Sequence, residues 1–292
     1  MQKSEVFYIM QIMKILILGA NSYVGARIYF ELQDIHEVVG TYHSNKISDK
    51  LIQLDITSKQ GVLDLVNKVK PEVIIHCANN ASKKWCDEHP KEAVILNQDS
   101  TSFVVEAANS VDAKLIYISS TAAINPKSLY GETKLASEDL VKKTKNDYLI
   151  LEPGIVIGFS PKVKKEDGFF SSLMDNLEDN KVVEYENSTQ YRPTYIGHLC
   201  EVIKEALDKK IWNKVIQVSI PVLKTKYEMA KDILESFGVS VREVDTPKID
   251  TNSRPQELSE LQKFNLPVCI YEEAISKIIT EIKNRDNYNE KF

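Results

Sequence analysis

The chain has 292 residues, of which 43% are hydrophobic and 27% are charged, as in an ordinary soluble globular protein with one large domain or two moderate ones. This composition excludes intrinsic disorder, collagen and disulfide-rich scaffolds. The 37 basic and 42 acidic residues give a net charge of −5, and the two signs are interspersed along the chain. We therefore expect no nucleic-acid partner, since no basic stretch marks such a surface.

The cysteines and the apolar runs indicate the compartment. None of the four cysteines belongs to a C-x-x-C pair, which is typical of free thiols in a reducing cytosol; they are Cys77, Cys86, Cys200 and Cys269. No apolar run approaches about 18 residues, so we predict no membrane span and no membrane partner. Residues 1–13 lack the apolar core and the cleavage site of a signal peptide. We expect a cytoplasmic protein.

The first half of the chain alternates short β-branched runs with amphipathic stretches. Strands are predicted at 14–18, 37–41, 51–55, 72–77, 114–119 and 148–152. Helices are predicted at 23–33, 58–69, 90–109 and 130–145, each long enough to cross back over a sheet. This alternation predicts an α/β fold with a doubly wound parallel sheet of the Rossmann type.

The regular alternation of predicted strands and helices ends at Pro153-Gly154. Further helices are predicted at 168–178, 195–209, 225–237 and 271–283, separated by brief extended pieces such as 214–219. We therefore divide the chain into an N-terminal extension (1–13), an NAD(P)-binding Rossmann domain (14–160), a smaller C-terminal α/β cap that binds substrate (most of 161–283) and a polar tail (284–292).

A glycine-containing turn joins the first predicted strand to the first predicted helix, with the sequence Gly19-Ala20-Asn21-Ser22-Tyr23-Val24-Gly25. The free N–H groups and the dipole at such a helix N-terminus can hold a pyrophosphate. Ser22 stands where a dinucleotide fingerprint usually has its middle glycine, and it offers a hydroxyl instead. A plain strand-to-helix turn is the alternative, but the position after the first strand of an α/β pattern favours a dinucleotide.

The end of the second predicted strand bears on the choice of cofactor. It carries no Asp or Glu that could accept a hydrogen bond from a ribose 2′-hydroxyl, and offers His43, Ser44 and Lys46. This favours NADP(H) over NAD(H). A solvated surface turn is the alternative.

Three Tyr-x-x-x-Lys pairs can each place a phenol and an ammonium one helical turn apart, where the cation can lower the pKa of the phenol. They are Tyr42/Lys46, Tyr130/Lys134 and Tyr227/Lys231. Only the second opens a helix just after a strand that ends in the hydroxyl run Ser119-Ser120-Thr121. That setting is the carboxyl edge where doubly wound sheets bind ligands, so we select Tyr130 and Lys134.

Several further motifs accompany these features: LDIT (54–57), HCA (76–78), the helix at Asn97, SST (119–121), YGETK (130–134) and EPGIVIG (152–158). Together they resemble an extended short-chain dehydrogenase/reductase. The cap resembles the dTDP-4-dehydrorhamnose reductase family, through RPTYIGHL (192–199) and SRPQELSEL (253–261). The likeness covers about residues 14–283.

The resemblance implies functional residues. Thr121, Tyr130 and Lys134 correspond to the hydroxyl residue, the proton donor and the lysine of the catalytic set, and Asp55 and Ile56 to residues that contact adenine. The cofactor site expected from the turn, the second strand and the resemblance comprises Gly19, Asn21, Ser22, Tyr23, Val24, Gly25, His43, Ser44, Lys46, Asp55, Ile56, Cys77, Ala78, Asn79, Asn97, Tyr130, Lys134, Pro153, Gly154 and Ile155.

Two features depart from the family. Only residues 122–129 separate the hydroxyl residue from Tyr130, whereas family members usually have a longer segment that shapes the substrate pocket. Glu152 replaces a common arginine, and a carboxylate is a less obvious neighbour for an anionic substrate. The resemblance therefore says less about the substrate than about the cofactor.

Two of the five arginines directly precede proline in predicted cap loops, namely Arg192 and Arg254. Guanidinium groups presented in this way suit the phosphates of a nucleotide ligand. Structural contacts to backbone carbonyls are the alternative.

A metal site is not expected. His76, Cys77, Cys86 and His89 could be combined into a zinc quartet. However, neighbours on a strand point to opposite faces, so His76 and Cys77 would not share one ion. Cys77 is better explained as a small core residue.

We therefore expect an NADP(H)-dependent reductase of a keto group on a nucleotide-activated sugar. The cofactor would give hydride to the carbonyl carbon, Tyr130 would donate a proton to the oxygen, Thr121 would fix that oxygen, and Lys134 would lower the pKa of Tyr130 and hold the nicotinamide ribose. The resemblance also suggests a homodimer packed through the helices at 90–109 and 130–145.

Two alternatives remain open. The family also includes the β subunit of methionine adenosyltransferase, a regulatory protein that resembles a reductase while serving as a partner. The presence of Thr121, Tyr130 and Lys134 argues against a loss of chemistry. A sugar-nucleotide epimerase or dehydratase is less favoured, because the loop after Ser120 lacks an Asp-Glu acid pair.

Overall fold

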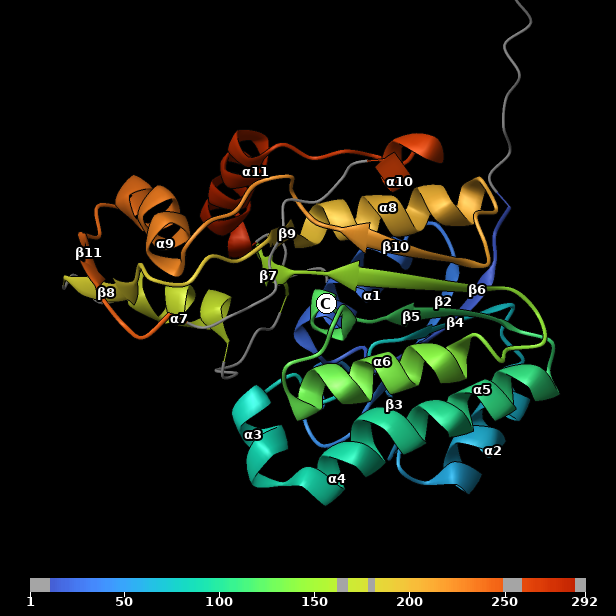
Figure 1. Cartoon of the computed structure of the whole chain (residues 1–292). Helices are drawn as coiled ribbons and strands as arrows, with labels where there is room; N and C mark the ends of the chain where they lie inside the picture. The colour runs from blue at the N-terminus through green and yellow to red at the C-terminus, as the bar shows by residue number, and fades with distance from the viewer. Residues whose placement is uncertain (1–10, 162–167, 178–181, 249–258, 287–292) are drawn as a thin grey trace, which may run out of the picture.

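The centre of the molecule is a seven-stranded sheet with the strand order β10-β6-β5-β4-β1-β2-β3 (Figure 1). The structure is a computed structural model that describes residues 11–161, 168–177, 182–248 and 259–286. Every neighbouring pair in the sheet is parallel. The strands are β1 (Lys14–Leu18), β2 (Glu37–Tyr42), β3 (Ile52–Gln53), β4 (Val73–His76), β5 (Lys114–Ile118), β6 (Tyr148–Pro153) and β10 (Lys214–Val218). The predicted doubly wound parallel fold is confirmed.

The apolar side chains of the central strands alternate between two cores because successive residues point to opposite faces. In β1, Ile15 and Ile17 belong to the core under α1 (Tyr23–Leu32) and α8 (Ile196–Asp208). Leu16 and Leu18 belong to the opposite core. That second face is covered by α2 (Lys59–Val69), α5 (Ser100–Ser110) and α6 (Leu129–Val141). Among the described residues, no helix is long and apolar enough to cross a membrane.

Two predicted elements differ from the structure. The strand expected at 51–55 is reduced to β3, because at the sheet edge the chain turns away through Asp55, whose carboxylate accepts a hydrogen bond from the Thr57 N–H (2.9 Å). The helix expected at 90–109 is broken into α4 (Pro90–Val94), a π-helical turn (Ile95–Asp99) and α5. A further helix, α3 (Lys83–Glu88), precedes it and is capped by Ser82.

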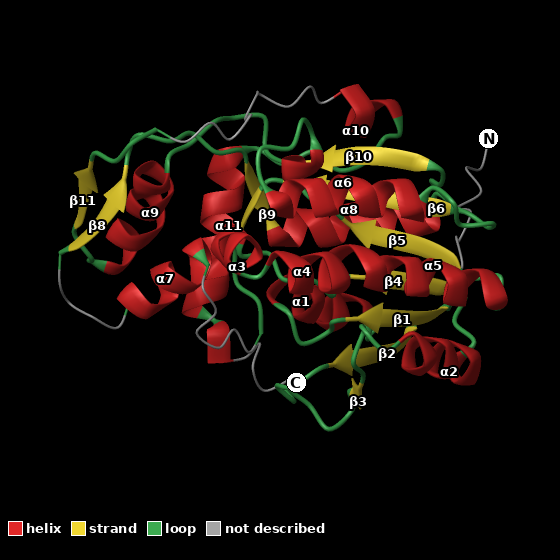
Figure 2. Ribbon diagram, turned by 60° about the horizontal axis from the view of Figure 1, so that its bottom comes forward, coloured by secondary structure: helices red, strands yellow, loops and turns green. Residues whose placement is uncertain are grey.

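The cap has its own core at the carboxyl end of the sheet, and Figure 2 shows β8, β11, α7 and α9 grouped there. Its described elements are β7 (Ile155–Ile157), α7 (Phe169–Asn176), β8 (Val183–Glu186), β9 (Pro193–Tyr195), α9 (Lys226–Leu234), a 3₁₀ turn (Glu235–Phe237), β11 (Val241–Val244) and α11 (Tyr271–Lys283). β8 pairs with β11, and β7 pairs with β9, both in parallel.

Part of the range assigned to the cap packs with the main sheet. β10 pairs with β6, with Ile216 opposite Leu151, and α8 lies against α1. The short α10 (Ser259–Lys263) contacts β10. The alternation of buried Ile216 and Val218 with half-buried Val215 and Gln217 suits a strand that closes the edge of the sheet. The cap proper is thus interrupted by a return to the first half of the fold.

Candidate functional site

A cavity of about 1380 Å³ opens at the carboxyl ends of the parallel strands and extends to the cap. This edge is where doubly wound folds bind ligands. The cavity brings together most of the site residues expected from the sequence: Gly19, Asn21, Ser22, Tyr23, Val24, His43, Ser44, Asp55, Ile56, Cys77, Ala78, Asn79, Thr121, Tyr130, Lys134, Pro153, Gly154, Ile155 and Arg192. Gly25, Lys46 and Asn97 do not line it, and Arg254 lies outside the described residues.

The glycine turn presents the N-terminus of α1 to this cavity. Gly19 has a φ of +82°, in the left-handed region, and its carbonyl accepts the Ser22 N–H (3.0 Å). Ser22 caps α1 by accepting the Gly25 N–H on its hydroxyl oxygen (3.1 Å). A Cβ on Gly25 would lie 2.1 Å from the Gly19 carbonyl oxygen, so Gly25 permits the turn without lining the cavity. The unpaired amides at this helix start suit a pyrophosphate.

The loop after β2 places His43 and Ser44 at the cavity and Lys46 to one side. Lys46 is exposed, and its ammonium is bound to the Asp49 carboxylate (2.7 Å). An exposed pair of this kind is weak, so it does not prevent Lys46 from turning toward a phosphate. The amide of Asn21 donates to the Asn45 carbonyl (3.2 Å) and ties this loop to the glycine turn.

Asp55 supplies an anionic acceptor at the same end of the cavity. Its carboxylate accepts hydrogen bonds from the Thr57 hydroxyl (2.6 Å) and the Thr57 N–H (2.9 Å), and the hydroxyl contact lowers the pKa of Asp55 most. Asp55 is therefore ionised at neutral pH, and Ile56 adds an apolar surface beside it.

Lys134, on α6, also lines the cavity and is 1% exposed. Its ammonium donates to the Ile118 carbonyl (2.9 Å) and lies 4.7 Å from the centre of the Tyr117 ring and 5.9 Å from that of Tyr130. Burial lowers the pKa of Lys134 to about 7. The Tyr-x-x-x-Lys spacing places the Lys134 ammonium near the Tyr130 ring, but the expected lowering of the Tyr130 pKa is not seen, because burial raises that pKa. Tyr227 and Lys231 lie on α9, away from the cavity.

Within the hydroxyl run, Ser120 is the residue that favours the ionised form of Tyr130. Burial raises the pKa of Tyr130 to about 12, and a hydrogen bond with Ser120 acts in the opposite direction. Ser120 begins the 3₁₀ turn Thr121–Ala123 and accepts the Ala122 N–H (3.2 Å). Thr121 also lines the cavity. The run of three hydroxyl residues in the sequence indicated that one of them would lie near Tyr130. Which one does so depends on the 3₁₀ turn, and packing determines that turn.

The short segment before Tyr130 packs directly against the first turn of α6. A Cβ on Gly131 would lie 2.5 Å from the Ala122 carbonyl oxygen, so only glycine allows this approach. Ser128 caps α6 by accepting the Gly131 N–H (3.3 Å). Residues 122–129 therefore hold Tyr130 beside Ser120 although the segment is short.

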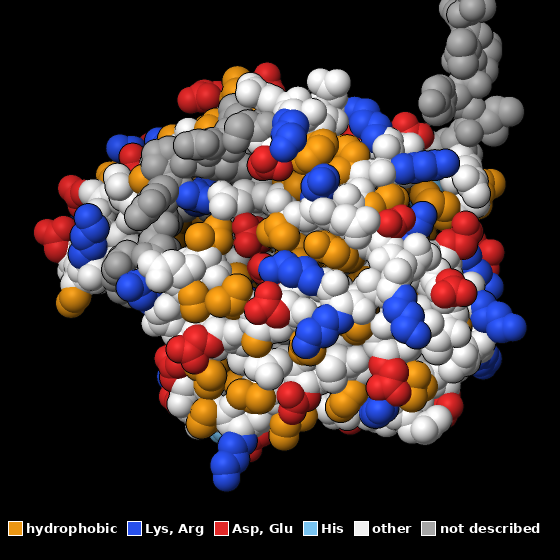
Figure 3. Space-filling model, turned by 45° about the vertical axis from the view of Figure 1, so that its right-hand side comes forward, with side chains coloured by type: hydrophobic (Ala, Val, Ile, Leu, Met, Phe, Trp, Pro, Cys, Tyr) orange, Lys and Arg blue, Asp and Glu red, His pale blue; other side chains and the backbone are white. Residues whose placement is uncertain are grey.

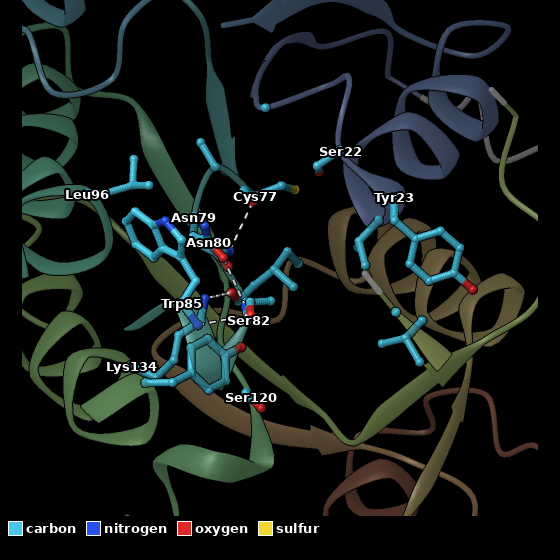
Figure 4. A pocket seen from close by; sticks show the side chains of 18 of the residues that line it. Ser22, Tyr23, Cys77, Asn79, Asn80, Ser82, Trp85, Leu96, Ser120 and Lys134 are labelled. Atoms are coloured by element: carbon cyan, nitrogen blue, oxygen red, sulfur yellow. Dashed lines mark hydrogen bonds between the residues drawn. The ribbon is translucent and has the colours of Figure 1, made fainter. Parts of the chain in front are cut away.

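Asn97 supports the site from behind. It is buried in the π-helical turn, where its amide oxygen accepts the Asn80 N–H (2.8 Å) and its amide nitrogen donates to the Asn80 carbonyl (3.0 Å). Its backbone carbonyl accepts the Ser137 hydroxyl of α6 (2.7 Å). Figure 4 shows Asn79, Asn80, Ser82 and Trp85 on this wall, with Ser22 and Tyr23 across from them. Asn80, Ser82 and Trp85 were not predicted from the sequence.

Arg192 enters the cavity from the cap side of the fold. Its guanidinium donates to the Gln217 side chain (2.7 Å), and burial lowers its pKa while Glu152 raises it. The backbone carbonyl of Arg192 accepts the Ile155 N–H (2.8 Å). A Cβ on Gly154 would lie 2.0 Å from that carbonyl oxygen, so glycine is required there.

Three further cations line the cavity and were not predicted: Lys83, Lys127 and Lys226. The Lys226 ammonium lies 5.2 Å from the centre of the Tyr191 ring. Elsewhere on the surface, both signs of charge are interspersed on the face drawn in Figure 3. The described residues hold no cluster of His, Cys, Asp and Glu that could bind a metal ion.

The whole chain can be compared with known protein families. Residues 13–283 match the family described as RmlD substrate binding domain. The chain belongs to this family. This confirms the resemblance read from its motifs, because the match covers both the Rossmann half and the cap.

The relatives of this RmlD-family chain include methionine adenosyltransferase subunits and reductases. The methionine adenosyltransferase 2 subunit beta of Bos taurus is 25% identical over 244 residues, which are 77% of this chain and 72% of the relative. The dTDP-4-dehydrorhamnose reductase of Salmonella typhimurium is 25% identical over 209 residues, 67% of each chain. Among solved structures, the Bacillus anthracis dTDP-4-dehydrorhamnose reductase in complex with NADP has a TM-score of 0.77 at 21% identity, covering 93% of this chain and 100% of that one.

Proposed function

We propose that this RmlD-family protein is an NADP(H)-dependent reductase of a keto group on a nucleotide-activated sugar. The observation that carries the proposal is the group formed by Tyr130, Lys134 and the Ser120 hydroxyl in the same cavity as the glycine turn. A dinucleotide whose pyrophosphate bound at that turn would place its nicotinamide near Tyr130, Lys134 and Ser120. The relatives named as reductases, and the neighbour that contains NADP, support the assignment.

The residues present fit the cofactor. The amides at the start of α1 face the cavity, and the turn closes only because Gly25 has no side chain. Bound nicotinamide supplies hydride to the carbonyl carbon of the substrate. Tyr130 donates its phenolic proton to the carbonyl oxygen, so that hydride and proton together convert the ketone to an alcohol. Ser120 and Thr121 hold that oxygen, and Lys134 holds the nicotinamide ribose and stabilises the phenolate left on Tyr130.

We further propose a preference for NADP(H) over NAD(H). His43 and Ser44 line the cavity after β2, and Lys46 stands behind them. A 2′-phosphate would take charge-assisted hydrogen bonds there, whereas residues 43–46 carry no carboxylate that would accept a ribose hydroxyl. Substrate phosphates would meet the buried guanidinium of Arg192, and Arg254 follows as a second candidate from the sequence.

The remaining assignments are also proposals. The segments 14–160 and most of 161–283 would act as cofactor-binding and substrate-binding parts, between an extension and a polar tail. The protein would work in the cytoplasm as a homodimer packed through α5 and α6, where the exposed Leu135 marks an apolar point on α6. Size-exclusion chromatography with light scattering tests the dimer.

A regulatory role is the second candidate, because the methionine adenosyltransferase 2 subunit beta of Bos taurus is similar to this chain over 77% of its length. Such a protein would need the cofactor cavity but not the proton donor. The presence of Tyr130 beside Lys134 in that cavity therefore favours the enzyme. An epimerase or dehydratase is less favoured, since residues 122–129 carry no acid.

The test is NADPH oxidation with keto derivatives of dTDP-, UDP- and GDP-sugars. Tyr130→Phe keeps the ring but removes the proton donor, so kcat should fall by roughly 10²–10⁴ while NADPH still binds. Tyr227→Phe, on α9, is the matched control and should leave kcat nearly unchanged. Wild-type protein that binds NADPH but oxidises none of it would move the assignment to the regulatory role. Activity that survives Tyr130→Phe would place the chemistry elsewhere.

A further inference from the structure

A tryptophan side chain lines the cavity on the wall across from the glycine turn. Trp85 of α3 is half-buried, and Figure 4 shows Ser22 and Tyr23 on the other side of the cavity. The cofactor proposed above binds through its pyrophosphate at the start of α1, and its expected site includes no residue of α3. The indole of Trp85 is therefore left for the substrate.

Helix α3 gives Trp85 a fixed position. Ser82 caps the helix by accepting the Trp85 N–H on its hydroxyl oxygen (3.2 Å), and the Trp85 carbonyl accepts the His89 N–H (2.8 Å). Cys86, the next residue, is fully buried and anchors the helix in the interior. Because α3 also contacts α6, the helix that carries Tyr130, the indole belongs to the same part of the fold as the proton donor.

An imidazole supports the indole from behind. The centres of the Trp85 and His89 rings lie 5.3 Å apart, with an angle of 32° between the ring planes. His89 is exposed and does not line the cavity, whereas Trp85 does. The indole is thus held against His89 on one side and faces the cavity on the other.

The surroundings of the indole combine apolar and polar groups, as a sugar requires. Figure 4 shows Leu96 and the side chains of Asn79, Asn80 and Ser82 on the same wall. A hexose has faces made of C–H groups and a rim of hydroxyl groups. The C–H groups pack favourably on the electron-rich face of an indole, and the hydroxyl groups take hydrogen bonds from amide and hydroxyl side chains.

We propose that the Trp85 indole is the surface on which the hexose ring of the nucleotide sugar packs. This inference rests on the proposed function, in which the substrate is a nucleotide-activated sugar. The contact orients the ring beside Tyr130, while the nucleoside diphosphate extends toward the cap. Trp85 therefore contributes to the affinity for the sugar and contributes little to the affinity for the nucleotide alone.

The experiment compares the affinities for UDP-glucose and UDP by isothermal titration calorimetry, with the full chain saturated with NADP⁺. Trp85→Ala should raise the dissociation constant for UDP-glucose roughly tenfold, the effect of one aromatic contact, and leave that for UDP unchanged. Lys84→Ala is the matched control, because Lys84 is exposed on the same helix and does not line the cavity. That control should bind both probes as wild type does. The pair dTDP-glucose and dTDP repeats the comparison with a second nucleotide.

Tryptophan fluorescence gives a second measurement that does not depend on whether Trp85→Ala folds. The chain has two tryptophans, and the other one, Trp212, lies just before β10, at the amino ends of the parallel strands. The emission of wild type should change when UDP-glucose binds and change much less with UDP. The change should persist in Trp212→Phe and disappear in Trp85→Phe.

A Trp85→Ala variant that loses affinity equally for UDP and UDP-glucose, or for neither, overturns the inference while the proposed function stands. So does an emission change that survives in Trp85→Phe. A loss of NADP⁺ affinity in Trp85→Ala, measured without a nucleotide sugar, would assign the indole to the cofactor and also overturn the inference alone. If neither UDP-glucose nor dTDP-glucose binds wild type, the proposed substrate class fails together with the inference.

Discussion

A buried ion pair joins the helix that carries the glycine turn to the last helix of the chain. Arg27 of α1 is 3% exposed and Glu281 of α11 is 6% exposed. The guanidinium donates to the Glu281 carboxylate (2.6 Å), which also accepts the Tyr195 hydroxyl (2.6 Å). In Glu281→Ala, Arg27 keeps the Phe159 carbonyl (2.7 Å) and the half-buried Glu31 (3.1 Å).

The expected loss of stability depends on how well Glu31 compensates the Arg27 charge once Glu281 is removed. Removing one partner of a buried ion pair costs about 3–5 kcal/mol, and Glu31 offsets part of it, so we expect Glu281→Ala to lose about 3 kcal/mol of the free energy of unfolding. At about 2–3 °C per kcal/mol, the thermal midpoint should fall by about 6–9 °C. Glu31→Ala should cost less than about 1 kcal/mol, because its carboxylate is partly solvated.

The assay is thermal unfolding followed by circular dichroism, with Glu273→Ala, an exposed change on the same helix, as the matched control. That control should stay within about 1 kcal/mol of wild type. A Glu281→Ala midpoint that coincides with the control would refute the reasoning, since it would mean that the buried Arg27 charge finds full compensation without its partner. The thermal midpoint of Glu281→Gln should lie between those of Glu281→Ala and the control, because an amide oxygen still accepts the Tyr195 hydroxyl.

Two further predictions concern the cavity. Ser120→Ala should lower kcat by roughly 10- to 100-fold and leave NADPH affinity unchanged. The Ser120 hydroxyl favours the ionised Tyr130, and a hydrogen bond to a charged group is worth about 1.5–3 kcal/mol. Steady-state kinetics should show a smaller loss for Thr121→Ala, and the reverse order would assign the hydroxyl role to Thr121. NADPH should bind more tightly than NADH. His43→Ala or Lys46→Ala should reduce that difference in binding free energy by about 1.5–3 kcal/mol, the value of a charge-assisted hydrogen bond. Fluorescence titration measures both affinities, and equal values for the two dinucleotides in wild type would refute the 2′-phosphate site without affecting the fold.

The sequence was sufficient for the parts of the fold that depend on local pattern. β1, β4, β5 and β6 are short runs of β-branched residues buried on both faces, and the structure places them within about a residue of the predicted bounds. The expected helix at 90–109 shows the limit. Its periodicity continues through the π-helical turn, which exists because Asn97 must face Asn80 and α6, and that is a tertiary requirement.

The candidate site divides in the same way. The glycine turn and the Tyr130/Lys134 pair follow from spacing along one strand and one helix, so the sequence was enough to select them. Ser120 and Lys226 were missed because their places in the cavity depend on a turn and on the docking of the cap.

Lys134 places a charge in the interior of the fold, where it costs stability. A buried ammonium with its pKa lowered to about 7 destabilises the fold by several kcal/mol below that pH, when folded and unfolded chains both carry the charge. As pH rises from 7 toward the ordinary lysine value, the unfolded chain holds more protons, so this cost disappears.

Lys134→Met keeps the apolar stem of the side chain but loses the hydrogen bond to Ile118 and the contact with the Tyr117 ring. We therefore expect the variant to be about 1–3 kcal/mol more stable than wild type at pH 7, with a smaller gain at pH 9, and inactive at both. Urea denaturation of the cofactor-free protein at the two pH values measures the difference. A variant less stable than wild type at pH 7 would show that the ammonium stabilises the fold. A stable but inactive variant would mean that Lys134 is kept at a cost in stability, which a role in holding the cofactor and stabilising the Tyr130 phenolate explains and a purely structural role does not.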